Sequence, residues 1–209
     1  MNYIFTDWNT VAPKWEGIQT KDNNSQINRK IENNKLQYQQ LVENQLWTIY
    51  PINLEKSTNW SYSAEFALLE AENDYTSQEL VLEVKNAKKE KKANIMFKIQ
   101  PINQSYGFGF DYKMPGNQYW SYEAIGKDGS ALQFKDVYNP IIKFRKSSDT
   151  RNILTIKKSN NKVELFINYH LIDTIQIDES NNYLNSVTGV GIVTSKKSTG
   201  TVKPIALSR

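Results

Sequence analysis

Apolar and polar residues alternate along most of the chain, and this period of two predicts β-strands rather than helices. In the run 162–167, for example, Val163, Leu165 and Ile167 fall on one face of a strand. Turn residues such as those at 159–161 separate this run from its neighbours. Similar runs predict further strands at 35–41, 46–52, 60–70, 94–100, 107–113, 118–125, 131–137, 140–145, 151–157, 171–177, 187–194 and 201–207.

The run 171–177 alternates in the same way, so its two faces carry different residues. Ile172, Thr174 and Gln176 fall on one face. Because residues two apart share a face, we expect Leu171 to lie on the same face as Ile175 and Ile177.

The segment 77–93 offers the best case for a helix, since Ser77 is a suitable helix N-cap residue. Leu80, Leu82 and Val84 nevertheless alternate, and the apolar run 95–99 follows. We therefore favour a β-hairpin with a charged, lysine-rich tip, and we keep the helix as the alternative.

The length of 209 residues suits one large all-β domain, and no repeat or Pro/Gly-rich linker divides the chain. Short strands at intervals of about 8–12 residues indicate a sandwich or a barrel, since each sheet must bury one face. We predict a single domain over 1–209, an antiparallel two-sheet sandwich with little helix. No apolar run approaches the ~18 residues of a transmembrane helix, so no membrane span is expected.

Charge is distributed unevenly, with a net −5 over residues 1–80 and a net +9 over 81–209. A basic face attracts nucleic acids or anionic surfaces. Only 4 of the 26 cations are arginines, however, and arginine is the residue preferred for bidentate phosphate and base contacts. We therefore interpret the lysines as the solvent side of strands, where they also protect sheet edges, and we expect no nucleic-acid partner.

The N-terminal residues show no basic segment followed by an apolar run of 7–15 residues, so no secretory signal is expected. Two readings of the compartment remain, a protein that stays inside the cell or a secreted protein whose leader has been removed. The chain has no cysteine, which excludes disulfide scaffolds, thiolate metal sites and thiol nucleophiles.

Several segments in this order resemble the concanavalin A-like jelly roll, the laminin-G and lectin–glucanase sandwich, and in particular its uncharacterised bacterial members. They are a strand entry at 31–36, the strand N-W-S-Y-S-A-E-F at 59–66, Y-G-F-G-F at 106–110 with 118–129, the pair of strands at 152–168, and G-V-G-I at 189–192. The resemblance implies a jelly-roll sandwich over most of the chain.

Two positions depart from the pattern of that family. Tyr169 follows Asn168 where the family carries glycine, which calls into question the usual positive-φ corner of a hairpin. The closing strand 201–207 lacks the family's F-D-N-F sequence, and Pro204 indicates a sheet edge or a bulge there.

Retaining glucanases of this fold carry Glu-x-Asp-x-x-Glu on one strand, with the outer carboxylates about 5–5.5 Å apart. This string is absent. Glu65 and Glu70 are separated by an odd offset, so they face opposite sides of a regular strand. Glu65 and Glu123 from different strands remain the alternative for a catalytic pair. Whether the protein is an enzyme stays uncertain, and we lean towards a non-catalytic role.

Other catalytic and metal sites have little support in the sequence. His170, the single histidine, lies beside a predicted hairpin corner and is expected to be an exposed turn residue. The glycines of 107–109 lie in a strand, where glycine permits close packing rather than phosphate binding. No Asp-x-Asp-x-Asp loop is visible, so no cofactor is expected. A structural calcium stays open, because lectin-like sandwiches hold calcium with scattered ligands.

Aromatic residues make up 12% of the chain, and aromatic side chains stack on the apolar faces of sugar rings. Alternation places Tyr119 on one face of its strand and both Trp120 and Tyr122 on the other. One of these faces is expected in the core. We predict Trp120, Tyr122, Glu123 and Asp111 as the neighbours of any ligand.

The sequence thus favours a non-catalytic module that binds an oligosaccharide or polysaccharide. A structural or protein-interaction sandwich is the alternative, since no compact polar motif is present, and a glycoside hydrolase is the third reading. Fold alone does not choose among them. The ligand and the oligomeric state stay open.

Overall fold

The computed structural model describes most, but not all, of the chain. The described residues are 3–5, 27–32, 35–40, 46–71, 76–86, 91–110, 134–136, 142, 151–179, 182–194 and 198–209. Everything below concerns these residues.

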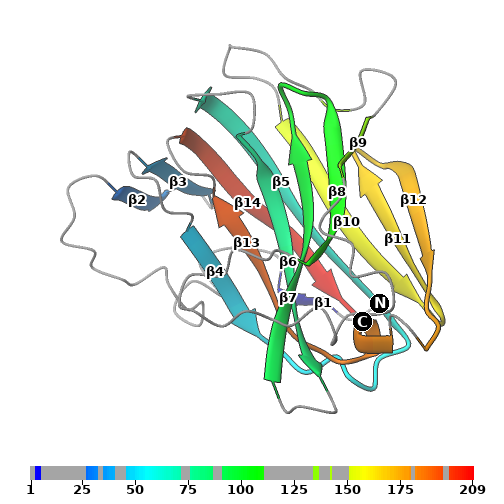
Figure 1. Ribbon diagram of the computed structural model, residues 1–209. Coiled ribbons are helices and arrows are strands. Elements are labelled where there is room, and N and C mark those ends of the chain that lie inside the picture. The colour runs from blue at the N-terminus through cyan, green and yellow to red at the C-terminus, as the bar shows by residue number, and fades with distance from the viewer. Residues whose placement is uncertain are drawn as a thin grey trace.

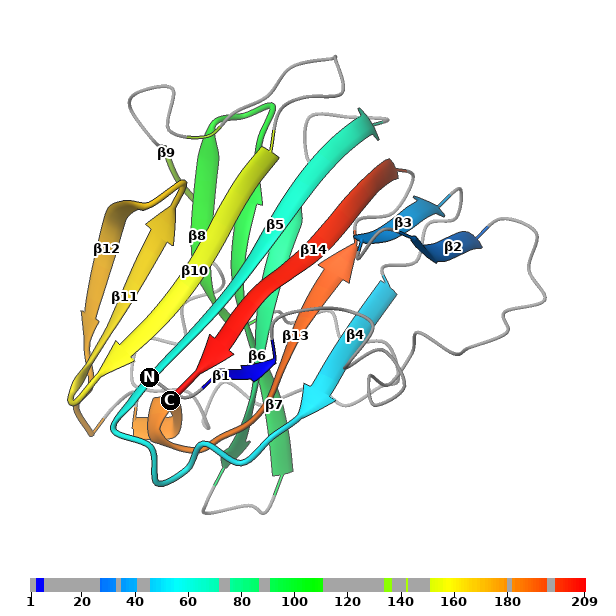
Figure 2. The same cartoon turned by 180° about the vertical axis from the view of Figure 1, so that it is seen from behind.

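The described strands form two antiparallel sheets, which lie one behind the other in Figures 1 and 2. The larger sheet has eight strands in the order β12-β11-β10-β5-β14-β3-β2, and β1 also pairs with β14. Its strands are β1 (Tyr3–Phe5), β2 (Ile27–Glu32), β3 (Lys35–Gln40), β5 (Asn59–Ala71), β10 (Arg151–Ser159), β11 (Lys162–Ile167), β12 (His170–Gln176) and β14 (Ser198–Ser208).

The smaller sheet has six strands in the order β4-β13-β6-β7-β8-β9. These are β4 (Leu46–Pro51), β6 (Gln78–Asn86), β7 (Lys91–Gln100), β8 (Ser105–Phe110), β9 (Phe134–Asp136) and β13 (Val187–Thr194). The one helix in the described part of the chain is the 3-10 turn η3 (Asn182–Asn185). The predicted all-β sandwich of two antiparallel sheets is therefore confirmed.

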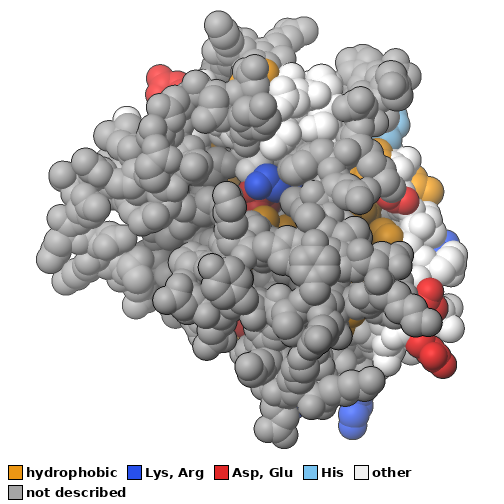
Figure 3. Space-filling view, viewed as in Figure 1, with side chains coloured by type: hydrophobic (Ala, Val, Ile, Leu, Met, Phe, Trp, Pro, Cys, Tyr) orange, Lys and Arg blue, Asp and Glu red, His pale blue; other side chains and the backbone are white. Residues whose placement is uncertain are grey.

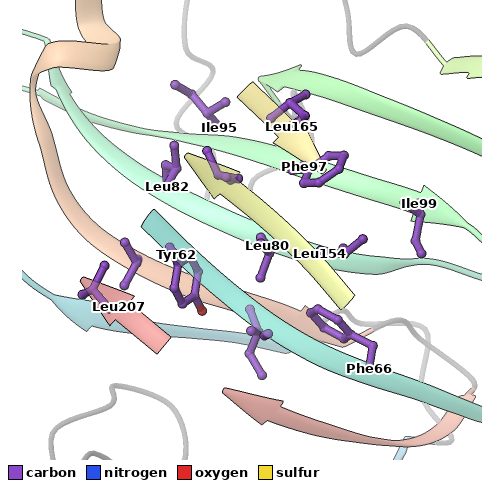
Figure 4. Packing of buried hydrophobic residues seen from close by; sticks show 14 of the residues in the cluster. Tyr62, Phe66, Leu80, Leu82, Ile95, Phe97, Ile99, Leu154, Leu165 and Leu207 are labelled. Carbon is purple, nitrogen blue, oxygen red and sulfur yellow. The ribbon is translucent and has the colours of Figure 1, made fainter. Parts of the chain in front are cut away.

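The core lies between the two sheets and follows the alternation of the sequence (Figure 4). In β10 and β11 every second side chain is buried. From the eight-stranded sheet, Tyr62, Phe66 and Leu154 meet Leu80 and Phe97 of the six-stranded sheet. Removing this apolar surface from water, at about 25 cal/mol per Å², is what holds the two sheets together.

The hairpin predicted over 77–100 is confirmed, and the helical alternative is wrong. β6 pairs with β7 from Gln78 opposite Ile99 to Asn86 opposite Lys91. Leu80, Leu82 and Val84 all join the core, because alternation in a strand gives one buried face.

Pro204 lies at an irregularity of the pairing between β14 and β5, where the register shifts between Pro204 and Ala206. A proline has no N–H to donate to the ladder and is tolerated at such a bulge. The bulge predicted for this position is therefore present.

A second bulge in the same pair of strands corrects the prediction for Glu65 and Glu70. Thr199 pairs with Glu70 and Gly200 with Leu68, so Leu69 is an extra residue in β5. The extra residue reverses the alternation beyond it. Both carboxylates consequently face away from the core, Glu65 opposite Lys203 and Glu70 bonded by the hydroxyl of Thr199 at 3.2 Å.

The edge strand β12 contains a bulge that corrects the expected grouping of its apolar residues. Leu165 pairs with Asp173 and Phe166 with Leu171, which leaves Ile172 as an extra residue. Leu171 is therefore 53% exposed, whereas Ile172 and Ile175 pack against the core.

The corner between β11 and β12 takes up positive φ without glycine. Asn168 has φ 50° and Tyr169 has φ 69°, and Ile167 pairs with His170 across this two-residue loop. The doubt raised by Tyr169 in place of glycine is thus answered, since the positive-φ corner forms with a tyrosine.

Two strands, β1 and β2, were not predicted, because their short sequences show little alternation. The predicted strands at 118–125 and 140–145 lie outside the described residues, apart from Ile142. The other predicted runs correspond to strands wherever the structure describes them.

Candidate functional site

The outer face of the eight-stranded sheet, which faces the viewer in Figure 2, carries polar side chains that reach solvent. Arg151 Nη1 lies 3.5 Å from Glu65 Oε1. Glu164 lies between Lys162 at 2.6 Å and Lys157 at 3.9 Å, and the hydrogen bond from Lys162 lowers the pKa of Glu164. Exposed pairs of this kind contribute little to stability or binding, so this face has the character of a solvated surface.

The outer face of the six-stranded sheet is different, because its central side chains are buried although they point away from the core. Val81, Met96 and Val193 form an apolar cluster of their own on β6, β7 and β13. Figure 3 looks onto this side of the molecule, and it shows a basic and an acidic side chain close together near the centre of the view.

A buried ion pair lies beside this apolar cluster. Glu79 of β6 is directly opposite Lys98 of β7, and Lys98 Nζ lies 3.0 Å from Glu79 Oε1. The Glu79 side chain has no exposed surface, while that of Lys98 retains 14%. The hydroxyl of Ser77 donates a hydrogen bond to the same carboxylate oxygen. Burying a carboxylate is costly unless it is paired, and here an ammonium and a hydroxyl compensate it.

More polar groups lie at the same end of the sheet, where β7 turns into β8. Gln100 Oε1 accepts hydrogen bonds from Ser105 Oγ at 3.2 Å and from Asn103 Nδ2 at 3.4 Å. Gln104 has φ 53° and donates from its amide to the carbonyl of Pro101 at 2.6 Å. These groups give the end of the face a polar rim.

Glycines occupy the outward-facing positions on both sides of the central strands. Gly107 is opposite Lys98, and Gly191 is opposite Val81. Gly189 is opposite Glu83, and a Cβ there would come within 2.9 Å of Ile49 Cγ2. Because these glycines have no side chains, little projects from the sheet on either side of the β6–β7 pair. Glycine in a strand also allows a neighbouring group to approach the backbone closely.

The charge of Glu79 is felt inside the sandwich. Burial raises the pKa of Tyr38 to about 12, a hydrogen bond with Ser198 works against the shift, and the negative charge of Glu79 adds to it.

Chemically, this arrangement can hold a polar ligand through Lys98. Its ammonium can donate hydrogen bonds to hydroxyl or carboxylate oxygens, and Glu79 fixes its position from below. We name the group made by Ser77, Glu79, Lys98, Gln100 and Ser105 the polar site.

The four residues predicted to line a ligand, Trp120, Tyr122, Glu123 and Asp111, lie outside the described residues, as does Tyr119. Asp111 directly follows Phe110, the last residue of β8. The prediction for these residues therefore stays a prediction, and so does the pairing of Glu65 with Glu123. Glu65 itself lies on the opposite outer face, next to Arg151.

His170 is exposed and begins β12, directly after the hairpin corner where it was expected. Within the described part of the chain, no group of three or more histidine, aspartate or glutamate residues is arranged to hold a metal ion. No helix among those residues is both long and apolar enough to cross a membrane.

Sequence reasoning missed Glu79 and Lys98, because a charged residue on the outward side of a strand normally faces water. A signal did exist, since a hairpin closed at residues 86–91 places the two opposite charges directly across from each other. Their burial, in contrast, depends on what packs over the sheet, which strand alternation does not encode.

No protein family and no curated protein sequence matches the chain. Solved structures do match, at low sequence identity. The carbohydrate-binding module CBM66 from Bacillus subtilis is 8% identical with a TM-score of 0.55, covering 88% of this chain and 92% of that one. The carbohydrate recognition domain of Emp46p, in its potassium-bound form, is 9% identical with a TM-score of 0.57, covering 98% and 92%.

A third structure, a protein of unknown function with a galectin-like fold from Bacillus subtilis, is 9% identical with a TM-score of 0.54 and covers 92% of this chain and 93% of that one. At such identities the likeness concerns the fold alone. The chain therefore has a jelly-roll sandwich of the kind found in lectin-like proteins, as the sequence resemblance implied. The laminin-G-like and bacterial parts of that resemblance stay predictions.

Proposed function

We propose that this protein is a non-catalytic glycan-binding module whose ligand contacts the outer face of the six-stranded sheet. The observation that carries the proposal is the Glu79–Lys98 pair on that face, which is enclosed where a solvated sheet would leave its charged side chains in water. The fold supports it, because two of the similar structures are a carbohydrate-binding module and a carbohydrate recognition domain.

Lys98 is the member of the polar site with surface left for a ligand. Glu79 has none, so it acts as a positioning residue that holds the ammonium group. Sugars need both hydroxyl partners and an apolar contact. We assign the second role to Trp120 and Tyr122, which share a face by alternation.

Affinity electrophoresis in gels containing xylan, mixed-linkage β-glucan, fructan, galactan or alginate tests this proposal, with calorimetry on the corresponding oligosaccharides. We expect at least one polysaccharide to retard the wild-type protein. Trp120→Ala and Tyr122→Ala should weaken that binding about tenfold, since a lost aromatic contact is worth about 1.5 kcal/mol.

The matched control is Lys157→Ala, which removes a lysine from the outer face of the other sheet and should bind like the wild type. Reducing-sugar assays on the bound polysaccharide should show no hydrolysis, and release of sugar would instead favour the glycosidase reading. If none of the polysaccharides retards the protein, the proposal is wrong.

A structural or protein-interaction sandwich is the second candidate. The observation in its favour is that the outward cluster of Val81, Met96 and Val193 has no exposed surface, which leaves less of this face open to a ligand. That candidate predicts no glycan binding, so the same gels separate the two.

A further inference from the structure

At the corner between β11 and β12, a tyrosine adopts a backbone conformation that is unfavourable for most residues other than glycine. A two-residue hairpin loop needs positive φ at both positions, and glycine is the usual second residue. Here that residue is Tyr169, with φ 69°. The left-handed region brings the Cβ too close to the neighbouring carbonyl, so the tyrosine destabilises this turn relative to glycine.

The conformation persists because the corner is held from inside the sandwich. Asn168 Oδ1 accepts from the backbone N–H of Ile153 at 2.8 Å, and its Nδ2 donates to Asn152 Oδ1 at 3.0 Å. Asn152, which is buried, donates in turn to Gln78 Oε1 at 3.2 Å in the other sheet. A network of this kind fixes the tip and lets strain survive.

Burial does not compensate for the strain at Tyr169, because its side chain is 78% exposed. Three large hydrophobic side chains are exposed among the described residues, and two of them, Tyr169 and Leu171, belong to this corner. In Figure 3 hydrophobic side chains and a histidine gather at the edge where β12 lies in Figure 1. Tyr169 has a strained backbone and an exposed side chain, so it does not stabilise the fold.

The corner lies at the same end of the sandwich as the polar site. Its anchor, Gln78, is the first residue of β6 and directly precedes Glu79. β11 ends at this corner. The start of β6, which holds Gln78, pairs with the end of β7 just after Lys98. A polysaccharide chain bound at that end of the six-stranded sheet would therefore lie near the β11–β12 corner.

We propose that Tyr169 is an aromatic contact residue for a sugar ring of a polysaccharide chain, an inference that rests on the proposed glycan binding. The flat ring presents an apolar surface to the C–H face of a sugar, and fixing it costs little conformational entropy. His170, the next residue and also exposed, supplies a hydrogen-bonding group for the hydroxyls. The rigid corner holds the ring ready for contact, so the binding free energy loses less to ordering.

The test replaces Tyr169 and measures folding and binding separately. Tyr169→Gly should raise Tm by about 2–4 °C because it relieves the left-handed strain. The same variant should bind the polysaccharide that retards the wild type about five- to tenfold more weakly in affinity electrophoresis. Tyr169→Phe and Tyr169→Trp keep a flat ring and should bind like the wild type.

Asn160→Gly is the matched control, because Asn160 also has positive φ, 51°, in the turn between β10 and β11 at the opposite end of β11. It should leave binding unchanged. If Tyr169→Gly binds as well as the wild type, or lowers Tm, the role of Tyr169 is refuted while the proposed function stands. If no polysaccharide retards the wild type, both proposals are refuted.

Discussion

At the scale of single residues, two charged side chains point outward from the six-stranded sheet as alternation predicts, yet they are largely enclosed. Glu79 and Lys98 are neighbours across β6 and β7, 3.0 Å apart, and the carboxylate is fully enclosed. Each charge removed from water carries a desolvation penalty, and the attraction between them offsets it only while both are present. The pair therefore behaves as one unit rather than as two contributions.

A double-mutant cycle tests that coupling. Lys98→Met leaves a buried carboxylate without its cation and should lower the free energy of unfolding by about 3–5 kcal/mol. Combining it with Glu79→Leu should restore most of that loss, because neither charge remains. Urea denaturation measures all four proteins.

Arg151→Met and Glu65→Gln, 3.5 Å apart on the other outer face with Arg151 48% exposed, make the more exposed control pair and should change stability by less than about 1 kcal/mol. Additive effects of the two substitutions at Glu79 and Lys98 would contradict the coupling.

At the scale of elements, β14 depends on a glycine near its start, Gly200. Gly200 is paired with Leu68 on one side and with Tyr38 on the other. A Cβ at this position would lie 2.5 Å from the carbonyl oxygen of Ala67 and 2.6 Å from the Tyr38 hydroxyl. The backbone oxygen cannot move without disturbing the ladder, so β14, β5 and β3 meet only around a residue without a side chain.

Gly200→Ala should therefore lower the free energy of unfolding by about 1–3 kcal/mol, as expected for an overpacked site. Thermal or urea denaturation provides the measurement. The neighbouring Thr201→Ala, which changes an outward-facing side chain, should stay within about 0.5 kcal/mol of the wild type. Equal stabilities for Gly200→Ala and the wild type would show that the sheet relaxes easily at this point.

At the scale of the whole molecule, tyrosine hydroxyls help to connect the two sheets across a largely apolar core. Tyr62 donates to the carbonyl of Gly191 at 3.1 Å, and Tyr106 donates to Asp173 Oδ2 at 3.1 Å. Burial raises the pKa of Tyr62, as it raises that of Tyr38. The folded state thus holds these phenol protons more tightly than the unfolded chain does.

This difference predicts a loss of stability at alkaline pH. The pKa of Tyr38 rises from 10.0 to about 12 on folding. Its contribution is complete below pH 10 and is lost as the pH rises through about 12, because the unfolded chain releases the proton first. Between these values one such group changes stability by about 1.4 kcal/mol per pH unit.

Urea denaturation between pH 9 and pH 12 should show a decline that becomes shallower in Tyr38→Phe, which has no phenol proton to lose. Tyr62 keeps a residual slope in that variant. An unchanged slope would mean that Tyr38 titrates alike in both states.

Much of the architecture could be predicted from the sequence, because alternation indicates which side of each strand packs against the other sheet. Val163, Leu165 and Ile167, or Leu80 and Leu82, could be assigned to a shared face from spacing alone, and this face is buried. The hairpin of β6 and β7 followed from the same rule. The exposure of His170 was expected from its place beside a hairpin corner.

The bulges could not be predicted in this way. A single extra residue in a strand moves all the following side chains to the opposite face, and it leaves no mark in the composition. Leu69 brings Glu70 to the side of Glu65, and Ile172 leaves Leu171 exposed. The candidate site was less predictable still. The aromatic prediction rests on residues 119–122, whereas the polar site arises from Glu79 and Lys98, whose identities gave no hint of burial.

By itself the sequence determined that this protein is built of β-strands with one buried face each, because residues two apart point to the same side of a strand, and the resemblance of its segments to the jelly roll favoured a sandwich over a barrel. Only the tertiary structure decided where the bulges fall, that a carboxylate and an ammonium lie enclosed on an outer face, and that a tyrosine stands exposed at a strained corner. These features depend on which strands become neighbours, and neighbours are set by the packing of distant segments rather than by the local pattern of any one of them.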